Sequence, residues 1–332
     1  MKIINDLKHN KKIALEKTDY LKKGKYVLLP NMRTYVHKDK YKEALSHFPG
    51  GVKSKAKLLF YKILRCFFAF KIKNTGEFNG EALYFSTVPN PAYRDCKVFS
   101  YDKEKVAIFC ANRKRFDLYM KNRNRNNMFP LPNLCEINEE SLYVCEEFFC
   151  YKENIVYNFK ELLHSLFDFY FNYYEKCNDL KESLHSLGNE ELLCQDVKVE
   201  ECPTLYLHHA DLSIDNLIYC KKPSKRIVFI DFDHENYYPP FYDIFFLMFN
   251  QLISNNNGSM IELFNSGIYD KYLCRYSEDN NLSLKNILTG PIKFLWYKRM
   301  QSYPQAKKEK IKKIFTDFVS TTLKRIENGK CE

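Results

Sequence analysis

Two short strand-like runs that each end near an aspartate constrain this chain more than any other feature. Residues 205–207 lead into a polar loop that contains Asp211 and Asn216, and residues 227–230 end at Asp231. A further strand-like stretch lies between the two runs, and a hairpin there would place the three polar side chains around one pocket. A carboxylate can accept a hydroxyl proton, and a carboxylate with a carboxamide can hold Mg²⁺. The pattern is therefore typical of phosphoryl transfer.

The same region carries three linked motifs. They are His-x-Asp-x-x-x-x-Asn over residues 209–216, Ile-Asp-Phe-Asp over residues 230–233, and Tyr-Asp-Ile over residues 242–244. Together they resemble the aminoglycoside phosphotransferase/choline kinase-like family, which has a protein-kinase-like fold, and they are similar to lipopolysaccharide core Kdo and heptose kinases. The resemblance implies an α+β, two-lobed protein-kinase-like fold with a small β-rich N-lobe and a larger, mainly helical C-lobe.

The resemblance also implies roles for individual residues. Asp211 stands at the position of the catalytic base, and Asn216 and Asp231 stand at the positions that bind Mg²⁺. The cofactors implied are ATP and Mg²⁺. The supporting or structural positions are those of His209, Asp243 and Asp233. We interpret His208 as an ordinary surface or core histidine.

The hydrophobic pattern predicts three parts along the chain. Residues 1–75 form a basic N-terminal extension with an amphipathic helix, residues 76–150 a β-rich N-lobe, and residues 151–332 a helical C-lobe with the catalytic loop and metal site. Strands of the N-lobe are expected at residues 82–88, 96–101, 106–111 and 141–149. Helices of the C-lobe are expected at residues 159–174, 180–194, 242–253 and 308–326.

The predicted N-lobe lacks a lysine that the family carries. Such kinases carry a lysine on the third strand, paired with a glutamate on the next helix. Here Cys110 stands near the lysine position, and no acidic residue lies between Asp117 and Cys135. The basic residues that could substitute are Lys97, Lys105, Arg113 and Arg115.

The glycine-rich loop is also missing. No glycine lies between Gly80 and Gly188, and residues 86–94 take the place of the loop. The candidate nucleotide-binding residues are Ser86, Thr87, Lys97, Lys105 and Glu146. Two interpretations follow: either an altered set of basic residues holds ATP, or the chain is a pseudokinase that serves as a binding scaffold.

Positive charge is concentrated in the first part of the chain. Residues 1–130 carry 29 basic and 11 acidic side chains, whereas residues 131–332 carry 23 and 30. Residues 53–73 hold seven basic side chains and no acidic one among many apolar ones, which predicts a basic amphipathic helix. Such a helix either contacts an anionic membrane or packs on the fold with its lysines extended into solvent. No recognised nucleic-acid-binding module is present, so we expect no nucleic-acid partner.

Several absences bear on location. The start of the chain has no apolar run of the length that a secretory signal needs, and no stretch is long and apolar enough to span a membrane. None of the 12 cysteines forms a Cys-x-x-Cys pair, so we expect reduced thiols. These features predict a cytoplasmic protein, with peripheral membrane association as the alternative that the basic helix leaves open.

The sequence therefore predicts an ATP- and Mg²⁺-dependent phosphotransferase. Its acceptor would be a hydroxyl of a small molecule or saccharide, and biosynthesis of a cell-envelope glycan such as lipopolysaccharide or capsule is the expected setting. An antibiotic-modifying phosphotransferase is the alternative within the same class, and the pseudokinase is the alternative outside it.

Overall fold

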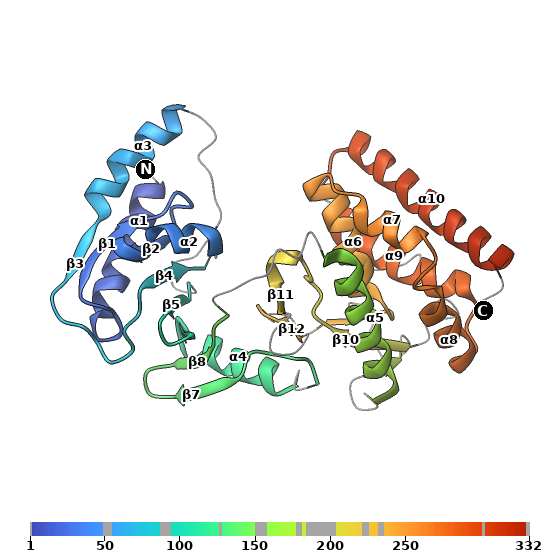
Figure 1. Ribbon diagram of the computed structural model, residues 1–332, viewed down its shortest axis with the longest axis horizontal. Coiled ribbons are helices and arrows are strands. Elements are labelled where there is room, and N and C mark those ends of the chain that lie inside the picture. The colour runs from blue at the N-terminus through green and yellow to red at the C-terminus, as the bar shows by residue number, and fades with distance from the viewer. Residues whose placement is uncertain are drawn as a thin grey trace. The chain divides into compact units, whose positions relative to one another are not determined.

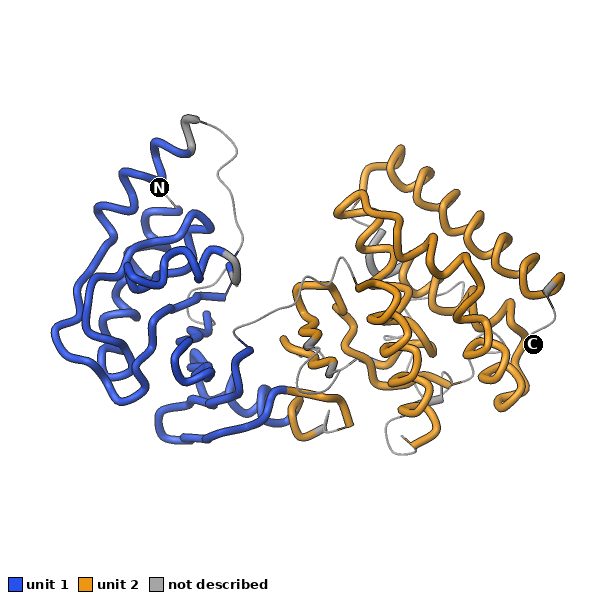
Figure 2. The backbone as a smooth tube through the Cα atoms, viewed as in Figure 1, with its two compact units in different colours: residues 1–121, 132–151 blue, residues 122–131, 152–332 orange. Residues whose placement is uncertain are grey.

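The chain folds into two compact units, which Figure 2 distinguishes by colour. Unit 1 comprises residues 1–121 and 132–151, and unit 2 comprises residues 122–131 and 152–332. The computed structural model describes residues 2–48, 55–86, 94–125, 128–149, 158–176, 181–183, 204–220, 226–231, 236–300 and 303–329. The expected α+β architecture is present, with a β-rich first unit and a mainly helical second one (Figure 1).

The described strands of unit 1 form an eight-stranded antiparallel sheet in the order β3-β1-β2-β4-β5-β6-β8-β7. Four helices accompany it: α1 (Lys2–Glu16), α2 (Tyr41–His47), α3 (Lys55–Phe68) and α4 (Arg113–Arg125). The strands are β1 (Gly24–Leu28), β2 (Thr34–His37), β3 (Phe70–Ile72), β4 (Ala82–Phe85), β5 (Cys96–Ser100), β6 (Lys105–Phe109), β7 (Leu134–Asn138) and β8 (Tyr143–Glu147).

Both faces of this sheet are buried, because side chains alternate between them along each strand. On one face, Tyr26 and Leu28 of β1 pack with Leu7 of α1 and Leu64 of α3. On the other face, one apolar cluster contains Val27 of β1, Ala44 of α2 and Tyr119 of α4. The strands expected at residues 82–88, 96–101, 106–111 and 141–149 correspond to β4, β5, β6 and β8, although Thr87 and residue 88 lie outside the described residues.

The predicted boundary at residue 75 is wrong. Strands β1, β2 and β3 extend the same sheet as β4 to β8, and Tyr35 of β2 pairs with Leu83 of β4. Residues 1–75 are therefore part of the β-rich unit. The Lys-rich composition that suggested a separate extension does not report such pairing, which joins residues far apart in the sequence. The helix expected over the basic segment is α3, and it ends at Phe68 because the chain enters β3.

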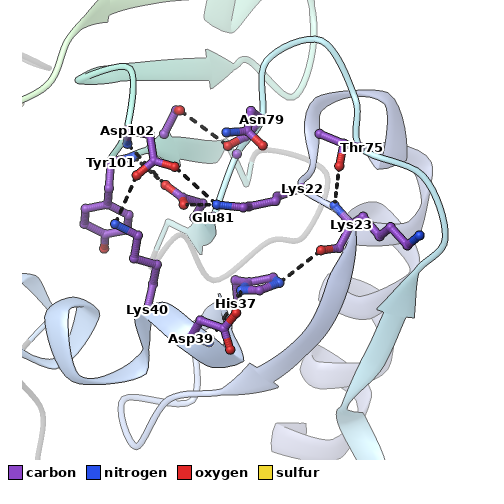
Figure 3. A network of polar contacts seen from close by, with 12 residues as sticks. Lys22, Lys23, His37, Asp39, Lys40, Thr75, Asn79, Glu81, Tyr101 and Asp102 are labelled. Carbon is purple, nitrogen blue, oxygen red and sulfur yellow. Dashed lines mark hydrogen bonds and ion pairs between the residues drawn. The ribbon is translucent and has the colours of Figure 1, made fainter.

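A buried carboxylate strengthens this junction (Figure 3). The side chain of Glu81 is fully buried, and it accepts hydrogen bonds from Lys22 Nζ at 2.9 Å and from the main-chain N of Tyr101 at 2.9 Å. Asp102 accepts from Lys22 Nζ at 3.2 Å and from Lys40 Nζ at 3.1 Å. Hydrogen bonds from Lys40 and Lys22 lower the pKa of Asp102 below its usual value. These contacts link the loops before β1 and after β2 to the β5–β6 turn.

Unit 2 is built around α6 (Tyr242–Asn255), whose residues from Tyr242 to Phe249 are all buried. A helix that is apolar on all sides belongs in the interior. The helices around it are α5 (Phe159–Lys176), α7 (Ser259–Asn265), α8 (Asp270–Asp279), α9 (Leu284–Met300) and α10 (Gln305–Gly329). The short strands are β9 (Lys181–Ser183), β10 (Thr204–His208), β11 (Leu217–Cys220), β12 (Arg226–Phe229) and β13 (Asn236–Tyr238).

One predicted helix of this unit begins differently. Residues 181–183, the start of the helix expected at 180–194, form β9 and pair with β10, while residues 184–194 lie outside the described residues. The expected helices at 159–174, 242–253 and 308–326 are present as α5, α6 and α10.

Two general expectations can be compared with the structure. Within the part of the chain that the structure describes, no helix is long and apolar enough to cross a membrane. Cys66, Cys96, Cys110, Cys135 and Cys145 are free thiols, as expected, but Cys274 is disulfide-bonded, which differs from the prediction.

Candidate active site

The loop after β10 is held in one conformation by its own hydrogen bonds. Ala210 has a φ of 68°, so the chain turns sharply after His209. The main-chain O of Asp211 then accepts from Ser213 N at 2.8 Å and from Asn216 Nδ2 at 2.9 Å. A short 3-10 turn over residues 214–216 leads into β11. Asp211 and Asn216 are thus connected directly, through the backbone of one and the side chain of the other.

Asp243, in the first turn of α6, joins this loop to the core. Its side chain is fully buried, and its Oδ1 accepts from Ala210 N at 2.9 Å. Its Oδ2 accepts from His209 N at 2.8 Å, from His208 Nδ1 at 3.1 Å and from Tyr170 Oη at 2.5 Å. Burial by itself would raise the pKa of Asp243, but His208 and the hydrogen bonds that the carboxylate accepts hold this pKa below the usual value. The carboxylate therefore fixes the turn that precedes Asp211.

The strand pair β11–β12 brings Asp231 to the same loop. Leu217 pairs with Phe229 at the open end of this hairpin, and Ile230 N donates to the main-chain O of Asn216 at 3.0 Å. His209 Nε2 is 2.8 Å from the main-chain O of Ile230. The hairpin expected from the sequence is present, and Asn216 and Asp231 lie beside each other where its strands begin and end.

The exposure of these side chains differs from that of Asp243. Asp231 is exposed and has a φ of 62°, and Asp211 is half-buried. A left-handed backbone is uncommon outside glycine, and it concentrates at functional sites. The loop thus presents two accessible carboxylates on a backbone that is tied to the buried one.

The residue types present fit a magnesium ion. Mg²⁺ prefers carboxylate and amide oxygens and keeps waters or substrate phosphates in its remaining positions. Because Nδ2 of Asn216 donates to Asp211, the amide oxygen is the atom left to coordinate a cation. The described residues hold no group of three or more His, Cys, Asp and Glu side chains that could bind a metal by themselves. Asp233 lies outside the described residues.

In unit 1, the ends of the loop between β4 and β5 are paired. Ser86 N donates to Asp95 O at 3.1 Å, and Ser86 Oγ accepts from Asp95 N at 3.1 Å. The candidate nucleotide-binding residues in this unit lie on neighbouring strands: Lys97 on β5, Lys105 at the start of β6, and Glu146 on β8. The Glu146 side chain is buried, and Oε1 accepts from Tyr119 Oη of α4 at 2.5 Å. Thr87 lies outside the described residues.

Near Cys110, where the family carries its lysine, the structure has an ion pair in which the positions of the acidic and basic residues are exchanged. Cys110 follows β6 and is buried. Arg115 of α4 donates from Nη2 and Nε to Asp95 Oδ2 at 2.7 and 3.2 Å, and the main-chain N of Ala111 donates to Asp95 Oδ1 at 2.9 Å. Here the helix supplies the cation and the sheet supplies the carboxylate. Arg113, the neighbouring candidate, lies near Asp117 and Glu139 at 3.7 and 3.5 Å.

Sequence reasoning missed several residues of these networks. Tyr170 and His208 contact Asp243 from α5 and β10, and Asp95 anchors α4. Tyr170 lies 73 positions from its partner, and no local pattern reports such a contact. The clearest available signal was the adjacent His208 and His209, of which only the second matched a motif.

Comparison with known proteins shows that the site region is similar to a kinase-like family. Residues 133–256 match the ecdysteroid kinase-like family, and this span contains Asp211, Asn216, Asp231 and Asp243. No curated protein sequence matches the chain. The resemblance to kinase-like phosphotransferases that the motifs predict is confirmed.

Solved structures of small-molecule kinases are distantly similar. They include amicoumacin kinase hAmiN in complex with AMP-PNP, Ca²⁺ and Ami, with a TM-score of 0.39 and 11% identity over 72% of this chain and 88% of that one. A choline/ethanolamine kinase family protein from Mesorhizobium loti has a TM-score of 0.35 and 11% identity over 71% and 91%. Choline kinase LicA from Streptococcus pneumoniae has a TM-score of 0.32 and 14% identity over 72% and 93%.

Proposed function

We propose that this chain, a kinase-like phosphotransferase, transfers the γ-phosphoryl group of ATP to a hydroxyl group in a Mg²⁺-dependent reaction. The observation that supports the proposal most directly is the arrangement of Asp211, Asn216 and Asp231. All three lie on one loop and hairpin whose backbone is bound to the buried carboxylate of Asp243 and to His209. Positioning and charge neutralisation supply most of the rate in phosphoryl transfer, so a fixed loop with accessible carboxylates suits this reaction.

Each residue has a distinct role in the proposed reaction. Asp211 orients the acceptor hydroxyl and accepts its proton while the hydroxyl oxygen forms a bond to the γ-phosphorus. The bond between the γ-phosphorus and the β–γ bridging oxygen breaks, and ADP leaves with that oxygen. Asn216 and Asp231 hold Mg²⁺ through their oxygens, and the ion, when bound, neutralises charge on the phosphates.

Unit 1 carries the residues that we propose for nucleotide binding. The loop between β4 and β5, closed at its base by Ser86 and Asp95, replaces the glycine-rich loop. Lys97 supplies positive charge close to the base of this loop, whereas Lys105 pairs with Ser100 at the far end of β5 and so lies away from the loop. Glu146 lies on the strand that we propose borders the nucleotide base. The reversed Asp95–Arg115 pair holds α4 to the sheet in place of the usual lysine–glutamate pair.

The acceptor that we propose is a saccharide hydroxyl of a cell-envelope glycan. The similarity of the site motifs to lipopolysaccharide core kinases supports this choice, as does the excess of positive charge in residues 1–130, which suits an anionic glycan at a membrane. The second candidate is a cationic antibiotic, which the net negative charge of residues 131–332 favours.

A ligand-dependent stability measurement tests the nucleotide site first. A ligand that binds only the folded state raises its stability by about 2.7 kcal/mol at one hundred times its Kd. We expect millimolar Mg²⁺-ATP to raise the Tm of the native chain and not that of the Asp231→Asn variant. No shift in the native chain would contradict the proposal and favour the pseudokinase.

Transfer itself is measured with γ-labelled ATP. Kdo- and heptose-containing oligosaccharides are compared with aminoglycosides as acceptors, and Asp211→Asn is the inactive control. Label in the saccharide supports the envelope-glycan proposal, whereas label in the aminoglycoside alone would replace it with the antibiotic-modifying function.

A further inference from the structure

Helices α1 and α3 form an apolar groove with a basic rim on unit 1. The groove has a volume of about 820 Å³, and its apolar lining includes Leu15 of α1 and Phe60, Ile63 and Phe67 of α3. Lys8, Lys11 and Lys12 of α1 also line it, together with Glu16. We call this surface the α1–α3 face.

The α1–α3 face is fixed by the fold. Leu7 and Leu64 are buried against the sheet, which holds the two helices beside each other. Lys11 Nζ donates to the main-chain O of Phe67 at 3.4 Å and of Ala69 at 3.1 Å. A lysine at the C-terminal carbonyls of a helix satisfies groups that have no partner within the helix and complements its dipole. Lys11 therefore joins α1 to the end of α3.

The outer side of α3 leaves large apolar side chains in solvent. Phe67 is 76% exposed, Leu59 is 63% exposed and Ile63 is 48% exposed. Residues four positions apart on a helix lie in one row, so these three side chains form a continuous apolar stripe. Contiguous exposed apolar surface of this kind marks an interaction site in monomeric proteins.

The charged side chains beside the apolar stripe indicate which kind of partner binds it. Lys62 of α3 is exposed, as are Lys8 and Lys12 of α1, and α3 contains no acidic residue. Glu16 is the acidic side chain at the groove, and it lies 4.0 Å from Lys12. Aromatic and aliphatic side chains that protrude beside lysines match the boundary between anionic headgroups and acyl chains.

We propose that the α1–α3 face docks the protein onto the surface of an anionic phospholipid bilayer. Phe67, Ile63 and Leu59 enter the acyl-chain boundary, while Lys8, Lys12 and Lys62 contact the lipid phosphates. The sequence pattern predicted membrane contact for residues 53–73 alone. The α1–α3 face also includes α1, which contributes Lys8 and Lys12. The proposal gives the phosphotransferase a membrane partner, but it does not depend on catalysis.

Vesicle binding tests this docking surface. The native chain is sedimented with vesicles of phosphatidylcholine containing 30% phosphatidylglycerol, and with vesicles of phosphatidylcholine alone, at low salt and at 0.5 M NaCl. We expect binding to the anionic vesicles that high salt weakens. Phe67→Ser removes a protruding aromatic side chain and should weaken binding about tenfold or more. The double variant Lys8→Glu/Lys12→Glu should weaken it at least as much, since each basic residue near the surface contributes to the attraction.

Matched controls separate docking from folding and from nonspecific charge. Ile268→Ser alters an apolar residue of unit 2 that is 39% exposed, and Lys310→Glu reverses an exposed charge on α10. Both should bind vesicles like the native chain, and all variants should keep the native Tm. Absence of native binding to anionic vesicles, or native-like binding by the Phe67 and Lys8/Lys12 variants, would overturn the proposal.

Two further readouts complete the test. Light scattering shows whether the native chain forms a dimer and whether Phe67→Ser dissociates it. A native dimer that does not bind vesicles would overturn the bilayer proposal and identify a second copy of the chain as the occupant of the face. Phosphoryl transfer to a soluble acceptor should be unchanged in Phe67→Ser. Loss of vesicle binding with intact transfer supports the docking surface, whereas failure of transfer in the native chain bears on the proposed function alone.

Discussion

Replacement of Asp243 by asparagine tests the physical basis of the site. Four donors converge on this carboxylate: Ala210 N on Oδ1, and His209 N, His208 Nδ1 and Tyr170 Oη on Oδ2. An amide has only one oxygen. If that oxygen keeps the three donors of Oδ2, the new NH₂ group faces the N–H of Ala210, and a buried donor loses its acceptor.

The magnitude follows from these contacts. An unsatisfied buried donor costs about 1–3 kcal/mol, and hydrogen bonds to a charged acceptor are each stronger by about 1 kcal/mol than neutral ones. Relief of the burial of one charge offsets part of this loss. We therefore expect Asp243→Asn to lower the free energy of unfolding by about 2–4 kcal/mol, a large part of the roughly 5–15 kcal/mol of a typical protein.

The single tryptophan of the chain provides the assay. Trp296 packs on the core of unit 2 and lies 6.2 Å from the ring of Phe315, so its fluorescence reports unfolding of the unit that contains Asp243. Urea titrations of the native chain, Asp243→Asn and Asp231→Asn give the three midpoints. Asp231 is exposed, so its variant should lie within about 0.5 kcal/mol of the native stability while it loses phosphoryl transfer. Equal midpoints for the native chain and Asp243→Asn would refute the reasoning.

The pH dependence of the same comparison supplies a second check. The pKa of Asp243 is lowered in the folded protein, so the ionised carboxylate stabilises the fold above the unfolded-state pKa of about 3.9. This contribution is lost as the pH falls through the folded-state pKa. The difference in unfolding free energy between the native chain and Asp243→Asn should therefore shrink below about pH 4.

Three further outcomes are expected. Asp211→Asn should reduce phosphoryl transfer by about 10²–10⁴-fold and keep the Tm increase with Mg²⁺-ATP; equal turnover would remove Asp211 from the base role. Glu81→Gln should destabilise unit 1 by about 1–3 kcal/mol, measured by thermal circular dichroism, because the hydrogen bonds from Lys22 and from Tyr101 N lose their charged acceptor; an unchanged Tm would contradict the network. The free energy of unfolding of unit 1 should decrease as the pH falls below about 4, because the lowered pKa of Asp102 stabilises the folded state above the unfolded-state pKa. In Asp102→Asn, the free energy of unfolding should change less over this pH range.

The local arrangement of the motif residues was more predictable than the contacts that support it. The motif residues Asp211, Asn216 and Asp231 are close in sequence, and the hairpin that connects them is visible as alternating short strands and a turn. Their support is not local. Tyr170 of α5 contacts Asp243, and Glu81, which precedes β4, contacts Lys22, so neither contact leaves a pattern within one segment.

The first 75 residues also show that a local pattern does not report contacts between distant segments. Composition identified α3 correctly as basic and amphipathic, because helical periodicity is a property of one segment. It did not reveal that β1, β2 and β3 extend the sheet, because strand pairing depends on partners up to dozens of residues away. The Lys-rich character of the segment suggested an independent extension, whereas Tyr26, Leu28 and Tyr35 are buried in the shared core.

The shared sheet connects the two proposals for unit 1. Helices α1 and α3 pack on the sheet that also carries the base of the β4–β5 loop. Strand β2 is hydrogen-bonded to β4 along the register from Thr34 to Val36. The buried carboxylate of Glu81, immediately before β4, forms an ion pair with Lys22. A bilayer that orients α3 would therefore also orient the strands that end at the proposed phosphate loop. A separate basic tail could bring the protein to a membrane without orienting it, whereas helices packed on the sheet fix the orientation of unit 1 at the bilayer surface.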